Sequence, residues 1–80
     1  MKELSKERKK IDKIDNKIVK LLEKRFEIVN RLKQLKKKNR IKMEDKQREE
    51  EIKSRYKLSK LPQDFVNKFF NLLFKEAKKN

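Results

Sequence analysis

The fold is decided by residues 4–35, which read LSKERKKIDKIDNKIVKLLEKRFEIVNRLKQL. Their apolar residues recur every seventh position in two columns, which correspond to heptad positions a and d. The a column holds Leu4, Ile11, Ile18 and Leu32, and the d column holds Ile14, Leu21, Ile28 and Leu35. No helix breaker interrupts residues 4–38, so one long helix is predicted there. Such a helix is about 50 Å long, which is more than an 80-residue chain can cover by itself.

Two shorter helices are predicted after the long one. Asn39–Glu44 reads as a connector, and Asp45 is a candidate N-cap for a second helix over Lys46–Leu58. After a short link over Ser59–Leu61, Pro62 suits the first turn of a third helix. The third helix has the richest apolar face in the chain, made of Phe65, Val66, Phe69, Phe70, Leu72, Leu73 and Ala77.

The composition favours one all-α domain over residues 1–80 that associates with itself. There is no glycine and one proline, which disfavours hairpins and glycine-rich phosphate loops. Only 34% of the residues are hydrophobic, and there is no cysteine to form a disulfide. A core this small rarely supplies more than roughly 3–5 kcal/mol. Self-association is therefore the expected source of further stability.

The net charge and the lengths of the apolar runs limit which partners the protein is expected to bind and in which cellular compartment it is expected to lie. The net charge of +14 favours an anionic partner such as nucleic acid, a membrane surface or a small acidic metabolite. The basic residues read as spread over the surface and not gathered on one face, which favours a solvated surface. The sequence has no apolar run that could span a membrane and no signal-peptide pattern, so a cytoplasmic location is expected.

Charged residues interrupt the apolar pattern of the predicted helices. Arg25 occupies an a position, and Lys36 lies on the neighbouring e column about 16 Å further along the helix. Arg8 lies on the e column about 25 Å from Arg25 in the other direction, so it could join the same pocket only from a partner chain. On the second helix, Arg48 and Glu49 face inward around Ile52 and Tyr56. Each charge taken alone also fits a salt bridge or a solvated surface.

These residues resemble the all-helical, type II class of chorismate mutase. The run from Arg8 to Asp15, followed by Ile18, Leu21-Leu22 and Lys24-Arg25, resembles the opening helix of that family. Lys36, Asp45 and Arg48-Glu49 continue the pattern without a gap. The run Phe69-Phe70-Asn71-Leu72-Leu73 is similar to the signature of the family's third helix.

The resemblance implies an intertwined, domain-swapped homodimer that rearranges chorismate to prephenate without a cofactor or a metal. Arg8 of the partner chain and Arg25 would hold the substrate carboxylates, and Lys36 would bind a carboxylate and the ether oxygen. Glu49 and the backbone near Asp45 would hold the ring hydroxyl, and Arg48 would help to order the site. The implied catalytic residues are Lys36, Arg25 and Glu49, and the implied substrate-binding residues are Arg8, Arg25, Lys36, Asp45, Arg48, Glu49 and Ile52.

The third helix departs from the family pattern. Ala77 stands where the family usually has serine, and Lys78 stands at a pocket position that is usually apolar. The family's Gln or Glu that donates to the ether oxygen would fall just after Asn80, and Lys78 and Lys79 read mainly as a solvated basic tail. Loss of one such donor typically costs about 10²–10³ in rate. The alternatives are a weak or inactive mutase-like domain, an isochorismate–pyruvate lyase-like enzyme, and a basic helical module for anions or nucleic acid.

Overall fold

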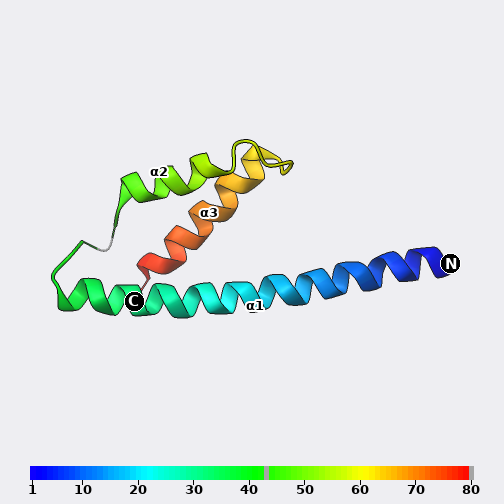
Figure 1. Ribbon diagram of the computed structural model, residues 1–80, viewed down its shortest axis with the longest axis horizontal. Helices are drawn as coiled ribbons and strands as arrows, with labels where there is room; N and C mark the ends of the chain where they lie inside the picture. Colours follow the sequence, from blue (N-terminus) through cyan, green and yellow to red (C-terminus); the bar gives the residue numbers. More distant parts are fainter. Residues whose placement is uncertain (43, 80) are drawn as a thin grey trace. The chain divides into compact units, whose positions relative to one another are not determined.

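The computed structural model describes residues 1–42 and 44–79, and over these residues the chain is all-helical with no strand. The helices are α1 (Lys2–Lys38), α2 (Lys46–Arg55) and α3 (Gln63–Lys78) (Figure 1). The predicted order of a long, a short and a medium helix is therefore confirmed. None of the helices in these residues is long and apolar enough to cross a membrane.

The chain divides into two units, and the boundary falls within α1. The first unit is Met1–Arg31, which is the greater part of that helix. The second unit is Leu32–Asn80, which contains the last turns of α1 together with α2 and α3. Each unit is described by itself below, and a single domain over residues 1–80 stays a prediction.

The long helix ends in a backbone cap that uses a residue other than glycine. Arg40 has a φ of 56°, in the left-handed region. Its amide bonds to the carbonyl of Lys37 at 3.3 Å, and the amide of Ile41 bonds to the carbonyl of Lys36 at 2.8 Å. This pair of bonds forms a Schellman motif, which satisfies carbonyls at the helix end. The connector predicted over Asn39–Glu44 follows, and its residue 43 lies outside the described residues.

The second helix begins as predicted and ends three residues earlier than predicted. Asp45 is its N-cap, and the carboxylate Oδ1 accepts a hydrogen bond from the amide of Arg48 at 3.0 Å. The helix ends at Arg55 and not at Leu58. Backbone amides between Tyr56 and Ser59 bond to carbonyls three residues back and not four. These tighter turns end the α-helical ladder.

The described core of the second unit lies on the third helix. Pro62 is the N-cap of α3, one position before the first helical residue, and not part of the first turn as predicted. The buried side chains are Val66, Leu73 and Phe74, which expose between 3% and 8% of their surface. Phe74 is missing from the predicted apolar face, whereas two predicted members, Phe65 and Leu72, are exposed.

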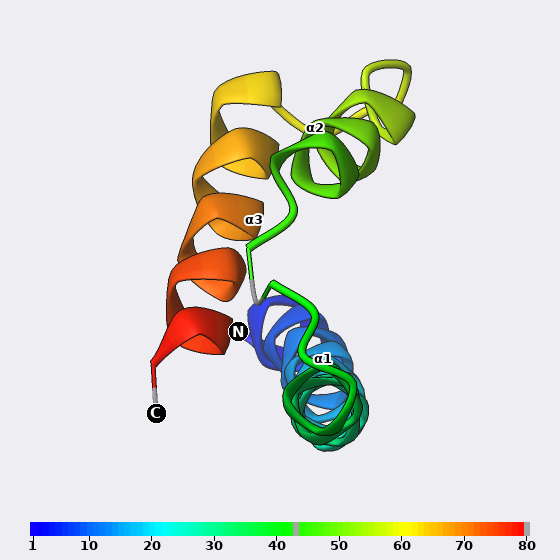
Figure 2. The same ribbon diagram turned by 90° about the vertical axis from the view of Figure 1, so that its left-hand side faces the viewer.

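The second and third helices lie side by side, as Figures 1 and 2 both show. The rings of Tyr56 and Phe70 stack with their centroids 5.3 Å apart and their planes 8° apart. Phe70 also stacks on Phe74 one turn later. On the polar side, Lys53 Nζ donates to Asn71 Oδ1 at 3.2 Å. The two helices are thus joined by an aromatic contact and a polar contact.

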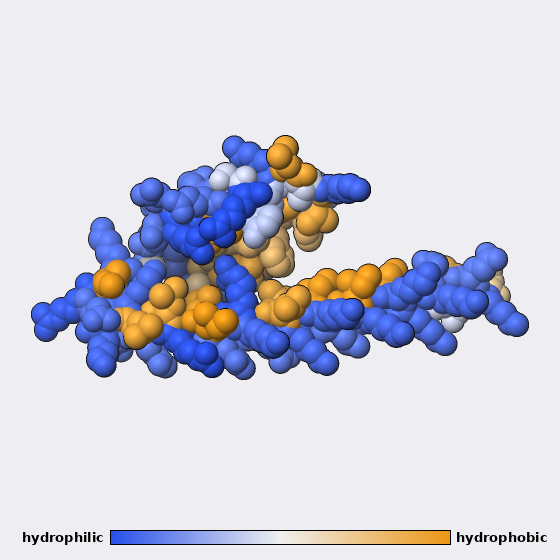
Figure 3. Space-filling model, viewed as in Figure 1, coloured by the Kyte–Doolittle hydropathy of each residue, from blue (hydrophilic) through white to orange (hydrophobic). Residues whose placement is uncertain are grey.

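The apolar columns of α1 are exposed in the single chain. Figure 3 shows orange side chains along this helix. The members of both columns expose between 42% and 65% of their surface, and they are Leu4, Ile11, Ile14, Ile18, Leu21, Ile28, Leu32 and Leu35. Isolated exposed apolar residues are ordinary, but a contiguous apolar stripe marks an interaction surface. In the described part of the chain, no residue of α1 is buried.

Part of the positive charge on α1 is aligned, contrary to the expectation from the sequence that it is spread over the surface. The helix is continuous, so residues seven apart lie on the same side. Within Met1–Arg31 one such column is Lys10, Lys17, Lys24 and Arg31, and the adjacent column is Lys6, Lys13 and Lys20. All these side chains are exposed. We name these seven residues the basic stripe.

Candidate functional site

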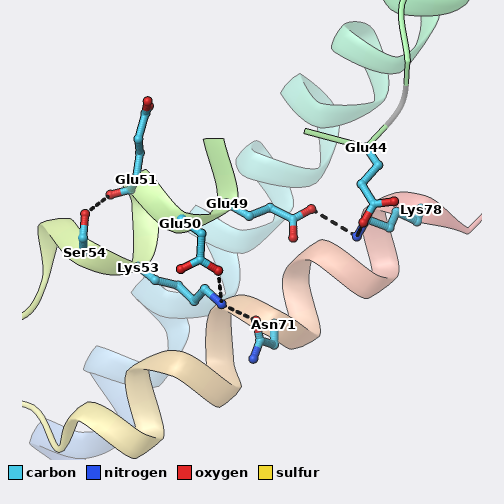
Figure 4. A network of polar contacts seen from close by, with 8 residues as sticks. All are labelled: Glu44, Glu49, Glu50, Glu51, Lys53, Ser54, Asn71 and Lys78. Atoms are coloured by element: carbon cyan, nitrogen blue, oxygen red, sulfur yellow. Dashed lines mark hydrogen bonds and ion pairs between the residues drawn. The ribbon is translucent and has the colours of Figure 1, made fainter. Parts of the chain in front are cut away.

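Lys78, at the end of α3, forms ion pairs with two carboxylates, one in the connector before α2 and one in α2 itself (Figure 4). Lys78 Nζ lies 3.1 Å from Glu49 Oε2 and 3.1 Å from Glu44 Oε1. The Glu49 side chain is 20% exposed, and that of Lys78 is 38% exposed. The bridge therefore joins the last turn of α3 to the first turn of α2 and to the connector before it.

A hollow lies beside this bridge, at the junction of α1, the connector and α2. Its volume is about 550 Å³. Its lining consists of Lys36, Ile41, Lys42, Glu44, Asp45 and Lys46. Three lysines and two acidic residues thus line the hollow. Lysines attract an anionic ligand.

The structure brings four of the seven predicted site residues into one region of the second unit. Lys36 is half-buried and shares the hollow with Asp45. Glu49 is half-buried one turn into α2, and Ile52 follows on the same side of that helix, also half-buried. Asp45 uses its carboxylate to cap α2.

The three predicted arginines are placed differently. Arg48 is exposed, and its contact with Asp45 is made by its backbone amide. Arg8 is exposed in the first unit. Arg25, also in the first unit, is half-buried, in contrast to its exposed neighbours Lys24 and Phe26.

The ion pairs around Lys78 shift the pKa values of Glu44 and Lys78. The pKa of Glu44 is lowered, first by the hydrogen bond from Lys78 and then by the charge of Lys78, with smaller effects from Lys46 and Lys42. The pKa of Lys78 is raised, first by its hydrogen bond to Glu49 and then by its hydrogen bond to Glu44. Both shifts favour the charged forms of Glu44 and Lys78.

Lys78, which the sequence suggested to be part of a solvated basic tail, is exposed but also forms two ion pairs. Phe70, Phe74 and Lys78 follow one another at four-residue intervals, and residues four apart lie on the same face of a helix. Lys78 therefore continues the face of α3 that carries the contact with α2. This spacing was visible in the sequence. The participation of Glu44 was not, because it depends on the path of the connector.

The lowered pKa of Glu44 predicts a dependence of stability on pH. A carboxylate with a lowered folded-state pKa stabilises the fold above its ordinary value of 4.5 and loses this contribution as pH falls through the lowered value. Replacing Glu44 with Gln should therefore lower the thermal midpoint at pH 6–7. The difference from wild type should shrink as pH falls below 4.5.

Thermal unfolding followed by circular dichroism between pH 3 and pH 7 measures this difference. The control is Glu51→Gln, since Glu51 is an exposed glutamate of the neighbouring helix α2. A Glu44→Gln difference that stays constant down to pH 3 would contradict the assigned ion pair.

The described residues thus define an all-helical protein with a mixed cationic and anionic hollow between its helices. The profile of the family described as chorismate mutase type II matches residues 7–80. The chain belongs to the type II chorismate mutase family. A search of curated proteins and a search of solved structures each gave no match.

Proposed function

We propose that this chain is a chorismate mutase that converts chorismate to prephenate in the synthesis of phenylalanine and tyrosine. The observation that carries the proposal is the family match over residues 7–80, a range that includes all seven expected site residues. The clustering of Lys36, Asp45 and Glu49 in one region of the second unit supports it further. We expect the enzyme to work in the cytoplasm.

The proposed site recognises a dianion with a ring hydroxyl. Arg25 and a partner chain's Arg8 hold the two carboxylates, since a guanidinium binds a carboxylate through two parallel hydrogen bonds. Lys36 binds a carboxylate and donates to the ether oxygen. Glu49 accepts a hydrogen bond from the ring hydroxyl, together with the backbone near Asp45. Arg48 orders the site, and Ile52 provides an apolar surface against the ring.

The residue types at the proposed site suit the rearrangement of chorismate to prephenate. A Claisen rearrangement breaks a C–O bond and forms a C–C bond within one molecule, so it requires neither a nucleophile nor a proton transfer. Negative charge develops on the ether oxygen as the C–O bond lengthens, and positive charge develops on the ring. Fixed ammonium and guanidinium groups stabilise this separation and hold the reactive conformer. Cationic side chains such as those of Arg25 and Lys36 are sufficient for both tasks.

The proposal includes an intertwined dimer, and the exposed columns of α1 support it. Their eight apolar residues expose 42–65% of their surface in the single chain. A second copy of the same helix is complementary to such a heptad stripe because each a or d side chain fits between four residues of the facing helix. A dimer of this kind would also bring Arg8 of one chain to the site of the other.

The test of the proposed function is the consumption of chorismate by the purified protein, with the product identified by NMR. We expect prephenate to form. A folded protein that leaves chorismate unchanged would contradict the proposal. Isochorismate is the second substrate in the same assay, and release of pyruvate from it would favour the lyase-like alternative instead.

A second candidate function is binding of nucleic acid, which the basic stripe of α1 favours. Its seven exposed cations are arranged along one side of a continuous helix. Binding through phosphate contacts should weaken steeply as salt increases. It should also survive Arg25→Ala, because Arg25 lies outside the stripe. Tight duplex binding at 150 mM salt without chorismate turnover would replace the mutase proposal with this one.

A further inference from the structure

Lys78 makes polar contacts with two separate segments of the chain. Lys78 is the last residue of α3, and side chains at the end of a helix are commonly solvated. Its ammonium nevertheless lies 3.1 Å from each of two carboxylates. These come from Glu44 in the connector and Glu49 in α2 (Figure 4). Its neighbour Lys79 instead pairs locally with Glu76, three residues back.

The backbone that carries Lys78 is held in place from several directions. One turn earlier, Phe74 is 8% exposed. Just beyond, the carbonyl of Lys79 accepts a hydrogen bond from Lys33 Nζ at 2.6 Å. Further back, Phe70 stacks on Tyr56. The ammonium is therefore presented from an anchored turn and can determine where its partners lie.

The two ion pairs contribute little to stability in themselves. Lys78 and Glu44 are 38% and 49% exposed, and exposed ion pairs typically add only a small stabilisation. Their effect on geometry is greater. A glutamate side chain has three rotatable bonds, and the contact with Lys78 restricts the Glu49 carboxylate to one position. The contact uses Oε2, while a carboxylate has a second oxygen that can accept a hydroxyl hydrogen bond.

We propose that Lys78 is a positioning residue that fixes the Glu49 carboxylate so that its second oxygen accepts the ring hydroxyl of the substrate. The inference rests on the proposed mutase function, in which Glu49 holds that hydroxyl. Glu44 serves as the second anchor of the ammonium and keeps it over the start of α2.

The experiment compares two substrates, chorismate and an analogue that lacks the ring hydroxyl. Lys78→Met should lower kcat/KM for chorismate about tenfold, the scale of one charge-assisted hydrogen bond, and leave kcat/KM for the analogue unchanged. Lys78→Arg should recover most of the loss because it restores a cationic donor. The double variant Glu49→Gln with Lys78→Met should be no worse than Glu49→Gln alone. Lys79→Met is the matched control and should behave as wild type.

Each outcome of this comparison either supports or overturns the positioning role of Lys78. Equal losses for both substrates, or no loss for either, would overturn the positioning role while leaving the mutase function intact. A wild-type protein inactive on chorismate would overturn the proposed function and this inference with it. Should Lys78→Met unfold in the thermal melt, Lys78→Gln takes its place with the same expected results, since its shorter amide side chain lacks the positive charge.

Discussion

Replacing Arg25 with Ala should lower kcat/KM for chorismate by about 10²–10³, the usual loss when one donor to a developing charge is removed. Arg25 occupies an a position of the long helix and is half-buried, as are Leu22 and Val29 about one turn to either side. In the proposed site it binds a substrate carboxylate bidentately, so alanine would remove two charge-assisted hydrogen bonds at once. Steady-state kinetics with purified protein measures the loss.

The matched control is Arg31→Ala, which removes the same side chain from an exposed position six residues further along the same helix. It should leave kcat/KM within about twofold of wild type, since exposed surface substitutions have small effects. Arg25→Lys should fall between wild type and alanine, because an ammonium keeps the charge but not the planar fork. Equal losses in Arg25→Ala and Arg31→Ala would contradict the assignment of Arg25 to the substrate.

Replacing Ile18 with Asp should separate the dimer. Ile18 lies on the a column and is 45% exposed in the single chain. Burial of one isoleucine is worth about 1.5–3 kcal/mol, and a symmetric interface counts the loss twice. The dissociation constant should therefore rise by about two to four orders of magnitude. The cost of bringing a carboxylate into an apolar interface adds to this.

Sedimentation equilibrium over a range of protein concentrations measures the change. Asn16→Asp is the matched control, since it adds the same charge to the same helix at an exposed position away from the a and d columns. Wild type and the control should be dimers at micromolar concentration, whereas Ile18→Asp should be a monomer with reduced helix content. A monomeric wild-type protein would contradict the proposed assembly.

The helices were predictable from sequence because their signals are local. The heptad columns, the Asp45 cap and the position of Pro62 each act within a few residues, and the structure confirms all three helices. The early end of α2 was not predictable, because it depends on how the turns after Arg55 tighten before α3 begins.

For the candidate site too, local patterns were predictable from sequence and contacts between distant segments were not. Lys36, Asp45 and Glu49 were identified from their spacing and the family resemblance, and they lie in one region of the second unit. The contact of Lys78 with Glu44 was missed because it joins residues 34 positions apart through a connector without a periodic pattern. Tertiary contacts of this kind depend on loop paths that local propensity does not encode.

The most direct test of the central claim is complementation between two inactive variants. In the proposed dimer each site takes Arg8 from one chain and Arg25 from the other. Arg8→Ala and Arg25→Ala should each be nearly inactive, because every site in either homodimer lacks one arginine. In a mixed dimer both losses fall in one site, and the other site is intact.

The two variants are unfolded together, refolded at equal concentration and assayed with chorismate. Random pairing makes half of the dimers mixed, and each has one complete site of its two. The account predicts recovery of roughly a quarter of wild-type activity. Activity no higher than the mean of the two separate variants would contradict a site shared between two chains.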